Sequence, residues 1–277
     1  MKRFLARIPL IGRILLIFLR LYKTLPFILT PIYNYLRWLI VSKETTNFTY
    51  DLEELNMLYM KSFVAEVTDK SFQEVATYVD EIQNDQAFQQ FIWNIYQSSS
   101  ESFKADKDVK LGRRMGWYAI IRATKPKVVI ETGVDKGLGS CVITAALKKN
   151  TEEGFPGRYY GTDINPRAGY LLQAPYANYG EILYGDSIET LKKFTEKIDI
   201  FINDSDHSET YEMDEYRVIQ NNIHKNTILI GDNSHISAKL QDFALETNRK
   251  FLYHHEIPKK HWYPGCGLGV AYHQSDI

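Results

Sequence analysis

The sequence predicts an α/β fold built on a doubly wound sheet of seven strands. Runs of β-branched and apolar residues that suit buried parallel strands alternate with stretches of helical period from Lys127 to the C-terminus. Such regular alternation is typical of a sheet with helices on both faces. The second observation is a glycine-rich turn between the first run and the next helix, because open α/β sheets bind nucleotides at such a turn.

The strands are expected at 127–131, 157–162, 180–184, 198–203, 226–231, 250–256 and 268–273. The helices between them are expected at 139–149, 167–173, 187–195, 209–221 and 236–247, with another at 111–124 before the first strand.

The chain is expected to divide into three parts. Residues 1–44 form a basic amphipathic segment, residues 45–110 a helical extension and residues 111–277 the α/β domain. The extension is polar with apolar residues at helical spacing, and one of its helices is expected near 86–96. It shows no catalytic pattern, so we expect its helices to cover one edge of the sheet.

Charge is distributed unevenly along the chain. Of the 33 Lys and Arg residues, eight lie in residues 1–43, where no acidic residue occurs. The other 25 stand against 34 Asp and Glu residues, so the rest of the chain carries a net charge of −9. An acidic body argues against nucleic acid as a partner. A basic, apolar segment favours an anionic membrane surface instead.

Residues 1–43 are expected to lie on that surface. Basic residues interrupt every window of about 20 residues that could span a bilayer, and no cleavable signal sequence is evident. A helix lying in the interface suits this mixture, with a true span and a docking arm on another subunit as alternatives. Cys141 and Cys266 make no disulfide framework, which indicates a reducing compartment. We therefore expect a cytoplasmic protein, peripheral on the inner face of the membrane, that could pair as a homodimer.

Acidic residues follow four successive strands, at the end of the sheet where α/β folds bind ligands. They are Glu131, Asp163, Asp186 and Asp204. Asp163 stands 24 residues beyond Gly139, where nucleotide-binding folds place a carboxylate for the ribose hydroxyls. One such acid is commonly just an exposed residue, but four in register predict a cofactor site.

The glycine turn resembles a known motif. Glu131-Thr-Gly133-Val-Asp135-Lys-Gly137 resembles motif I of class I S-adenosylmethionine (SAM)-dependent methyltransferases, E/D-x-G-x-G-x-G, with Asp135 where the middle glycine usually stands. Residues 111–277 are similar to the small O-methyltransferases of the catechol and caffeoyl-CoA type, and to the related branch of sugar and macrolide O-methyltransferases and cephalosporin hydroxylase-like proteins. The resemblance implies a Rossmann-like sheet that ends in an antiparallel hairpin. It also implies SAM as cofactor, bound by Glu131, Gly133, Gly137, Asp163, Asp186 and Ser187.

The same resemblance implies a divalent metal. Caffeoyl-CoA-type enzymes hold one with a D-x-D-K stretch after strand four and a D-N pair after strand five. Asp204-Ser-Asp206-His207 and Asp232-Asn233 stand at those places here, which implies Asp204, Asp232 and Asn233 as ligands of Mg²⁺ or Mn²⁺. Such a metal would lower the pKa of an acceptor hydroxyl. An Asp-Asn pair is also common in an ordinary turn.

His207 departs from the family pattern, which has lysine at that place. With Asp204 it could form the catalytic pair that takes the proton from the acceptor hydroxyl. Alternatively, it caps the following helix or makes a supporting hydrogen bond.

These observations predict a SAM-dependent methyltransferase that methylates a hydroxyl of a small molecule, a sugar or a lipid-linked glycan. Two alternatives keep the fold and change the activity: a cephalosporin hydroxylase-like enzyme, and a SAM-binding protein without catalysis. An NAD-dependent reductase fits poorly because its glycine spacing, G-x-G-x-x-G, is absent.

Overall fold

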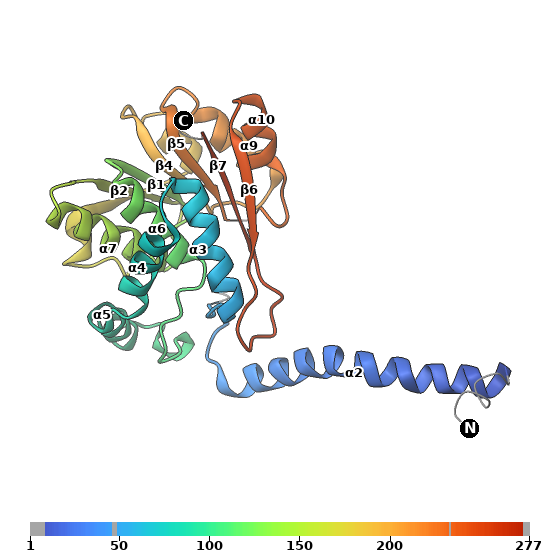
Figure 1. Cartoon of the computed structure of the whole chain (residues 1–277). Coiled ribbons are helices and arrows are strands. Elements are labelled where there is room, and N and C mark those ends of the chain that lie inside the picture. The colour runs from blue at the N-terminus through green and yellow to red at the C-terminus, as the bar shows by residue number, and fades with distance from the viewer. Residues whose placement is uncertain (1–8, 46–48, 233, 274–277) are drawn as a thin grey trace.

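The computed structural model describes residues 9–45, 49–232 and 234–273. These residues form one sheet with helices on both faces, and a long N-terminal helix that leaves this body (Figure 1).

The sheet has seven strands in the order β3-β2-β1-β4-β5-β7-β6. Their bounds are β1 (Val128–Thr132), β2 (Arg158–Asp163), β3 (Gly180–Tyr184), β4 (Ile198–Asn203), β5 (Ile223–Gly231), β6 (Lys250–His255) and β7 (Gly267–Tyr272). Strands β1 to β5 are parallel, and β7 runs antiparallel to both β5 and β6. The predicted doubly wound sheet with an edge hairpin is confirmed. The order reverses between β1 and β4, and the ends of these strands border the crevice in which such sheets bind ligands.

Helices cover both faces. One face carries α3 (Glu54–Thr68), α4 (Phe72–Gln83), α5 (Gln86–Ser98), α6 (Arg114–Thr124) and α7 (Leu138–Glu152), and the other carries α8 (Ser187–Leu191), α9 (Glu209–Val218) and α10 (Lys239–Glu246). Alternation along β1 separates the two cores, since Val129 packs with the first group and Val128 and Ile130 with the second.

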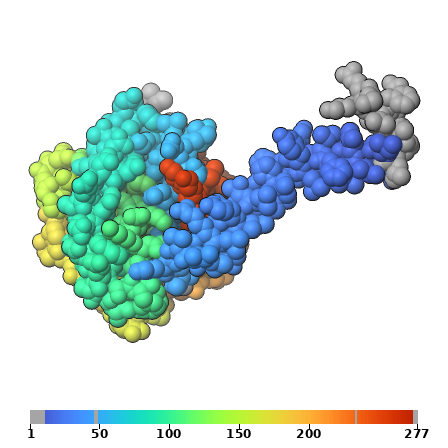
Figure 2. Space-filling model, turned by 90° about the horizontal axis from the view of Figure 1, so that it is seen from below, coloured from blue at the N-terminus to red at the C-terminus, as the bar shows by residue number. Residues whose placement is uncertain are grey.

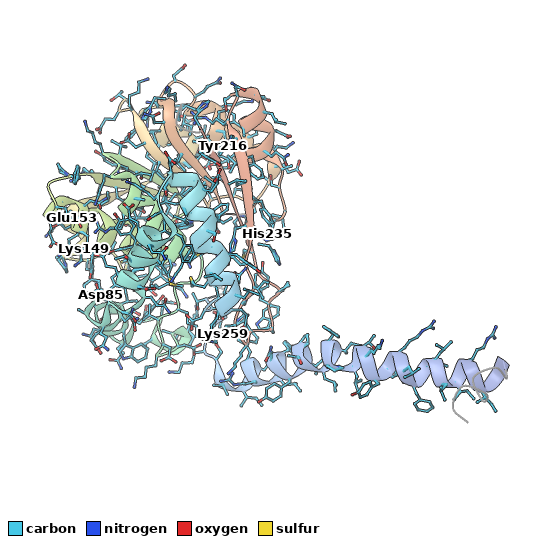
Figure 3. The ribbon with its side chains drawn as sticks, in the orientation of Figure 1. Asp85, Lys149, Glu153, Tyr216, His235 and Lys259 are labelled. Atoms are coloured by element: carbon cyan, nitrogen blue, oxygen red, sulfur yellow. The ribbon has the colours of Figure 1, made fainter. Side chains whose placement is uncertain are left out.

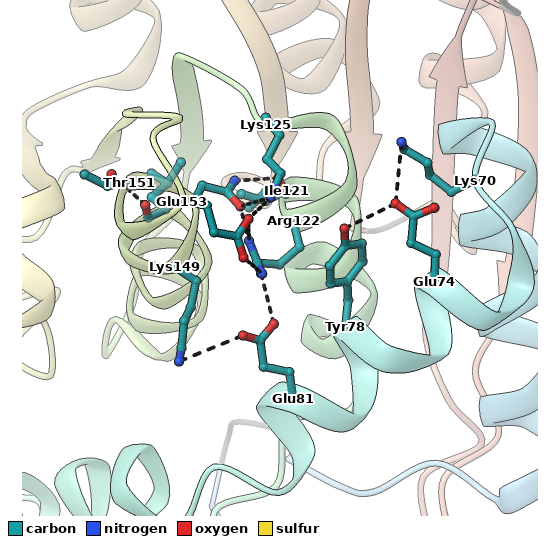
Figure 4. Close-up of polar contacts among 12 residues, drawn as sticks. Lys70, Glu74, Tyr78, Glu81, Ile121, Arg122, Lys125, Lys149, Thr151 and Glu153 are labelled. Atoms are coloured by element: carbon teal, nitrogen blue, oxygen red, sulfur yellow. Dashed lines mark hydrogen bonds and ion pairs between the residues drawn. The ribbon is translucent and has the colours of Figure 1, made fainter.

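A buried arginine joins the helical extension to the α/β domain (Figure 4). Arg122 of α6 donates from Nε to Glu81 of α4 at 2.9 Å, and from Nη2 to Glu153 at the end of α7 at 2.5 Å. Its hydrogen bonds outweigh the cost of burial and raise its pKa, while the same contacts lower the pKa of Glu153 to about 2. The extension therefore shares one core with α6 and α7.

The predicted helix at 167–173 is absent, and turns take its place. Two of its backbone donors bond to the glycine-rich turn: the Gly169 N–H donates to the Asp135 carbonyl at 2.6 Å and the Leu171 N–H to the Lys136 carbonyl at 3.0 Å. Gly169 also has a φ of +74°, which interrupts a helix. This segment covers the turn after β1.

Helix α2 (Pro9–Val41) extends away from the body and continues through Pro26 and Pro31 (Figures 1 and 2). By length and composition its stretch Ile11–Val41 could cross a membrane, and none of it is buried inside the protein. Only its C-terminal end touches the body. There Asn34 donates to the His261 carbonyl at 3.4 Å, and the Trp38 ring lies 5.2 Å from that of Trp262.

Candidate active site

A cavity of about 660 Å³ opens at the carboxyl ends of β1, β2, β4 and β5. This volume is in the range of small-molecule and cofactor sites. Its wall brings together most of the predicted site residues: Glu131, Gly133, Asp163, Asp204, His207 and Asp232. It also includes residues for which no site role was predicted, among them Arg113, Arg114, His235 and Cys266.

Asp163 holds the glycine-rich turn in place. One carboxylate oxygen accepts from the backbone N–H groups of Val134 at 3.1 Å and Asp135 at 2.9 Å, and the other accepts from the N–H of Asn165 at 2.8 Å. Gly133 has a φ of +80°, and a Cβ there would overlap the Asp204 backbone. The chain therefore needs glycine at the place where the cavity meets the main chain.

Glu131 lies under the first turn of α7 and is buried. It accepts hydrogen bonds from Ser140 at 3.0 Å and from Tyr159, and a Cβ on Gly139 would overlap its Oε1. Burial raises the pKa of Glu131 to about 7, although the two hydroxyl donors oppose the shift.

Arg113 occupies the place where the sequence implied a metal. From the start of α6 its Nε and Nη2 donate to the two carboxylate oxygens of Asp232, which follows β5. Burial acts to lower the pKa of Arg113, but Asp232, Glu256 and Asp204 outweigh it, so this pKa is raised. Burial and the charge of Asp232 raise the pKa of Asp204 well above its ordinary range.

The described residues at this place do not fit a divalent ion. Both oxygens of Asp232 are bonded to a guanidinium, and the part of the chain that the structure describes holds no group of three or more His, Cys, Asp or Glu side chains that could bind a metal. The third predicted ligand, Asn233, lies outside the described residues.

Residues 130–234 match the family model for a methyltransferase domain. These residues form a SAM-dependent methyltransferase domain. A solved O-methyltransferase from Bacillus cereus, in complex with SAH, is 14% identical, covers 72% of this chain and 96% of its own length, and gives a TM-score of 0.52. A candidate O-methyltransferase from Klebsiella pneumoniae gives 0.51 at the same identity and coverage. At this identity the likeness shows the fold. No curated protein matches the chain.

Three predicted cofactor residues of the methyltransferase domain have structural partners. Asp186 caps α8 by accepting from the Glu189 N–H at 2.9 Å, and it accepts from the Tyr211 hydroxyl at 3.0 Å. Ser187 donates to Glu215. Gly137 precedes α7 with a φ of +94°. None of the three is among the described residues that line the 660 Å³ cavity, and their role in cofactor binding stays a prediction.

Glu215 of α9 is a buried hub that was not predicted from the sequence. It accepts from Thr132 at the end of β1 at 2.9 Å, from Asn203 at the end of β4, and from Ser205 at 2.8 Å. Its pKa is raised by burial, and its hydroxyl donors oppose this. One side chain thus fixes the spacing of the two strand ends at the middle of the site. No local motif marks it, since it is one of several acids on a polar helix.

Two histidines line the cavity. His207, the predicted base, is exposed on its wall. His235 follows β5 and lies at the lower edge of the sheet in Figure 3, with Nε2 3.5 Å from the Tyr263 hydroxyl. Its Nδ1 is buried and has no hydrogen-bond partner among the described residues. Burial lowers its pKa. Its only sequence signal was its position three residues after Asp232.

A larger cavity, of about 1060 Å³, lies between α3, α5 and the loop 107–111. Its described lining contains no residue from the carboxyl end of a strand. The glycine-rich turn and the strand-end acids meet in the smaller cavity instead.

Proposed function

We propose that this protein transfers a methyl group from SAM to the oxygen of a hydroxyl on a small molecule, a sugar or a lipid-linked glycan. The observation that carries the proposal is that Glu131, the turn at Gly133 and Asp163 line the same cavity. This cavity lies where the strand order of the methyltransferase sheet reverses.

The cavity suits SAM in shape and charge. Gly133 and Gly139 leave room where a Cβ would overlap the wall, and α7 begins beside them with its N–H groups. Asp163 retains lone pairs for the ribose hydroxyls, because a carboxylate offers about four acceptor sites and three are used. The buried Nε of Arg114 has no hydrogen-bond partner among the described residues, which suits a carboxylate such as that of SAM.

An acceptor hydroxyl must lose its proton during the transfer, and SAM when bound supplies the electrophilic methyl group. His235 is the candidate base that we favour, since its imidazole lines the cavity with one buried nitrogen that makes no hydrogen bond. Its lowered pKa keeps it neutral, and so able to take a proton, at neutral pH. His207 lines the same cavity and is the second candidate.

Titration calorimetry with SAM tests the cofactor site. Asp163→Ala removes the carboxylate that holds the turn and the proposed ribose acceptor, so SAM affinity should fall by about 1.5–3 kcal/mol. Asp199→Ala, which removes a strand-start acid far from the cavity lining, is the matched control and should leave the affinity unchanged. Unchanged SAM affinity in a folded Asp163→Ala variant would sink the assignment.

Product mass then tests the reaction. Extracts incubated with the protein and methyl-labelled SAM should contain a product that gains one CH₂ unit and the label. A product that gains one oxygen atom would instead favour the hydroxylase-like alternative. SAM binding without any labelled product from lipid, glycan or small-molecule fractions would favour a non-catalytic protein.

We also propose that α2 lies in the surface of an anionic membrane, at the cytoplasmic face. At about 100° per residue, the cations of α2 (Arg13, Arg20, Lys23 and Arg37) fall within an arc of roughly 120°. Among residues 11–41, the opposite half of the helix carries only apolar residues, tyrosines and Pro26. A wide apolar face opposite a cationic one is the pattern of an interfacial helix.

The contacts between α2 and the body support this orientation. Asn34, Tyr35 and Trp38 approach the β6–β7 loop, and all three project from the cationic side of the helix or its border. Figure 2 shows the red atoms of that loop beside the blue C-terminal end of α2. Tyr263 and Cys266, at the end of the same loop, line the catalytic cavity. An acceptor at the membrane surface would thus be close to the cavity mouth, which favours a lipid-linked one.

A further inference from the structure

Three carboxylates lie around Arg113 at the wall of the cavity. Asp204 follows β4, Asp232 follows β5 and Glu256 follows β6, and the last two are almost completely buried. Carboxylates that stay ionised while buried close together need a compensating cation. In the enzymes that this domain resembles, a divalent metal fills that role at the first two positions.

Here the compensating cation belongs to the chain itself. The planar guanidinium of Arg113 pairs with both oxygens of Asp232 in the bidentate geometry that suits a carboxylate. Its Nε also lies 3.9 Å from Glu256. A metal ion would have to bind the same Asp232 oxygens at roughly 2.0–2.3 Å, so it could enter only by displacing the guanidinium.

The position of Arg113 is fixed by its surroundings. It directly precedes α6, and Gly112 before it has a φ of +51° and approaches the Tyr50 carbonyl. The Tyr50 hydroxyl in turn donates to Glu256 at 2.5 Å. The arginine and its acids are therefore held together by α6, β5 and the strand leading to the β6–β7 loop.

We propose that Arg113 replaces the divalent metal of the related enzymes and that the acceptor site works without one. This rests on the proposed methyl transfer. The bonds to Asp232 use Nε and Nη2, and Arg113 lines the cavity, so its other Nη can donate to the acceptor oxygen. A fixed positive charge there stabilises the negative charge that develops on that oxygen as its proton leaves.

Binding of Mn²⁺ to the full chain, measured by electron paramagnetic resonance, tests whether Arg113 replaces the metal. The wild-type protein should bind no Mn²⁺ at this site at millimolar concentrations of the ion. Arg113→Gln should gain one Mn²⁺ site, and the double variant Arg113→Gln, Asp232→Asn should lose it again. Arg114→Gln is the matched control, because it removes a neighbouring arginine of the same cavity whose Nε has no hydrogen-bond partner among the described residues, and it should gain no Mn²⁺ site.

Two results would overturn the inference. One is stoichiometric Mn²⁺ binding by wild type that Asp232→Asn abolishes, a comparison that does not require the Arg113 variant to fold. The other is a folded Arg113→Gln protein, judged by its thermal melt, that gains no Mn²⁺. SAM calorimetry on wild type tests the proposed function separately, since loss of SAM binding would leave the Mn²⁺ results unaffected.

Discussion

At the scale of single residues, buried charge governs this site. Glu131, Glu215, Asp232 and Glu256 are all buried near the carboxyl ends of the strands. Each is held by hydroxyl, amide or guanidinium donors instead of by solvent. Burial raises the pKa of Glu131, Glu215 and Glu256, so the protonation of these three carboxyl groups couples the site to pH.

Glu131 provides a pH prediction. Its pKa is about 7 in the folded protein against an ordinary value of 4.5. Between these values the folded state keeps a proton that the unfolded state has released, so stability falls as pH rises through this window. The slope is at most about 1.4 kcal/mol per pH unit. Denaturant unfolding should show that the advantage of Glu131→Gln over wild type grows from pH 4.5 to 7 and then levels off.

The control for this prediction is Glu54→Gln, which changes a carboxylate whose side chain is 90% exposed. Its stability should follow the wild-type curve across the same pH range. If the Glu131→Gln curve also runs parallel to wild type, the carboxyl group is not held protonated by burial.

Sequence reasoning located the acids that end strands and could not see their partners. Glu131, Asp163, Asp204 and Asp232 were found because strand ends are readable from apolar runs, and all four line the cavity. Arg113 and Glu215 were missed because their importance comes from contacts with residues more than a hundred positions away, or with three elements at once. No local pattern records such a contact.

At the scale of elements, the same reasoning predicted the strands well and one connection poorly. Short apolar runs bounded by turn residues mark strands, so all seven were found. The segment 167–173 has helical composition, but two of its N–H groups donate to the carbonyls of Asp135 and Lys136 in the turn. Tertiary hydrogen bonds thus overrode local propensity.

The close packing of that segment on the turn leads to a prediction for Gly137. Its φ is +94°, and a Cβ there would lie 3.0 Å from the Cα of Gly169. Gly137→Ala should cost at least about 1–2 kcal/mol of stability from the backbone conformation alone. It should also weaken SAM binding, because the added carbon would push the glycine-rich turn away from the segment 167–173 that packs on it. Unfolding and calorimetry on the same variant measure both effects.

Gly154→Ala separates conformation from close packing. Gly154 has a φ of +89° and no neighbouring atom within 4 Å. The Gly154→Ala variant should lose a similar amount of stability from its backbone conformation and keep full SAM affinity. Equal SAM affinity in the two variants would show that the contact between Gly137 and Gly169 does not shape the cofactor site.

At the scale of the whole molecule, charge and direction of the chain favour an interfacial α2 over a spanning one. The helix has 33 residues and is about 50 Å long, well beyond the hydrocarbon core of about 30 Å. Six of the eight basic residues of 1–43 precede Thr24. A span would place most of them on the side opposite the SAM-binding body, against the preference of basic segments for the cytoplasmic side.

Vesicle sedimentation with the full chain tests the interfacial arrangement. The triple substitution Arg13→Glu, Arg20→Glu, Lys23→Glu should weaken binding to anionic vesicles at least about a hundredfold, since each basic residue near such a surface contributes about 1 kcal/mol. The matched control makes the same charge change on exposed residues of the body, Lys192, Lys193 and Lys197. It should bind nearly as wild type, because these residues lie outside the lipid-facing helix. Equal loss of vesicle binding in both variants would mean that only the net charge of the protein matters. Wild-type protein that stays on the vesicles in alkaline carbonate would mean that α2 spans the membrane.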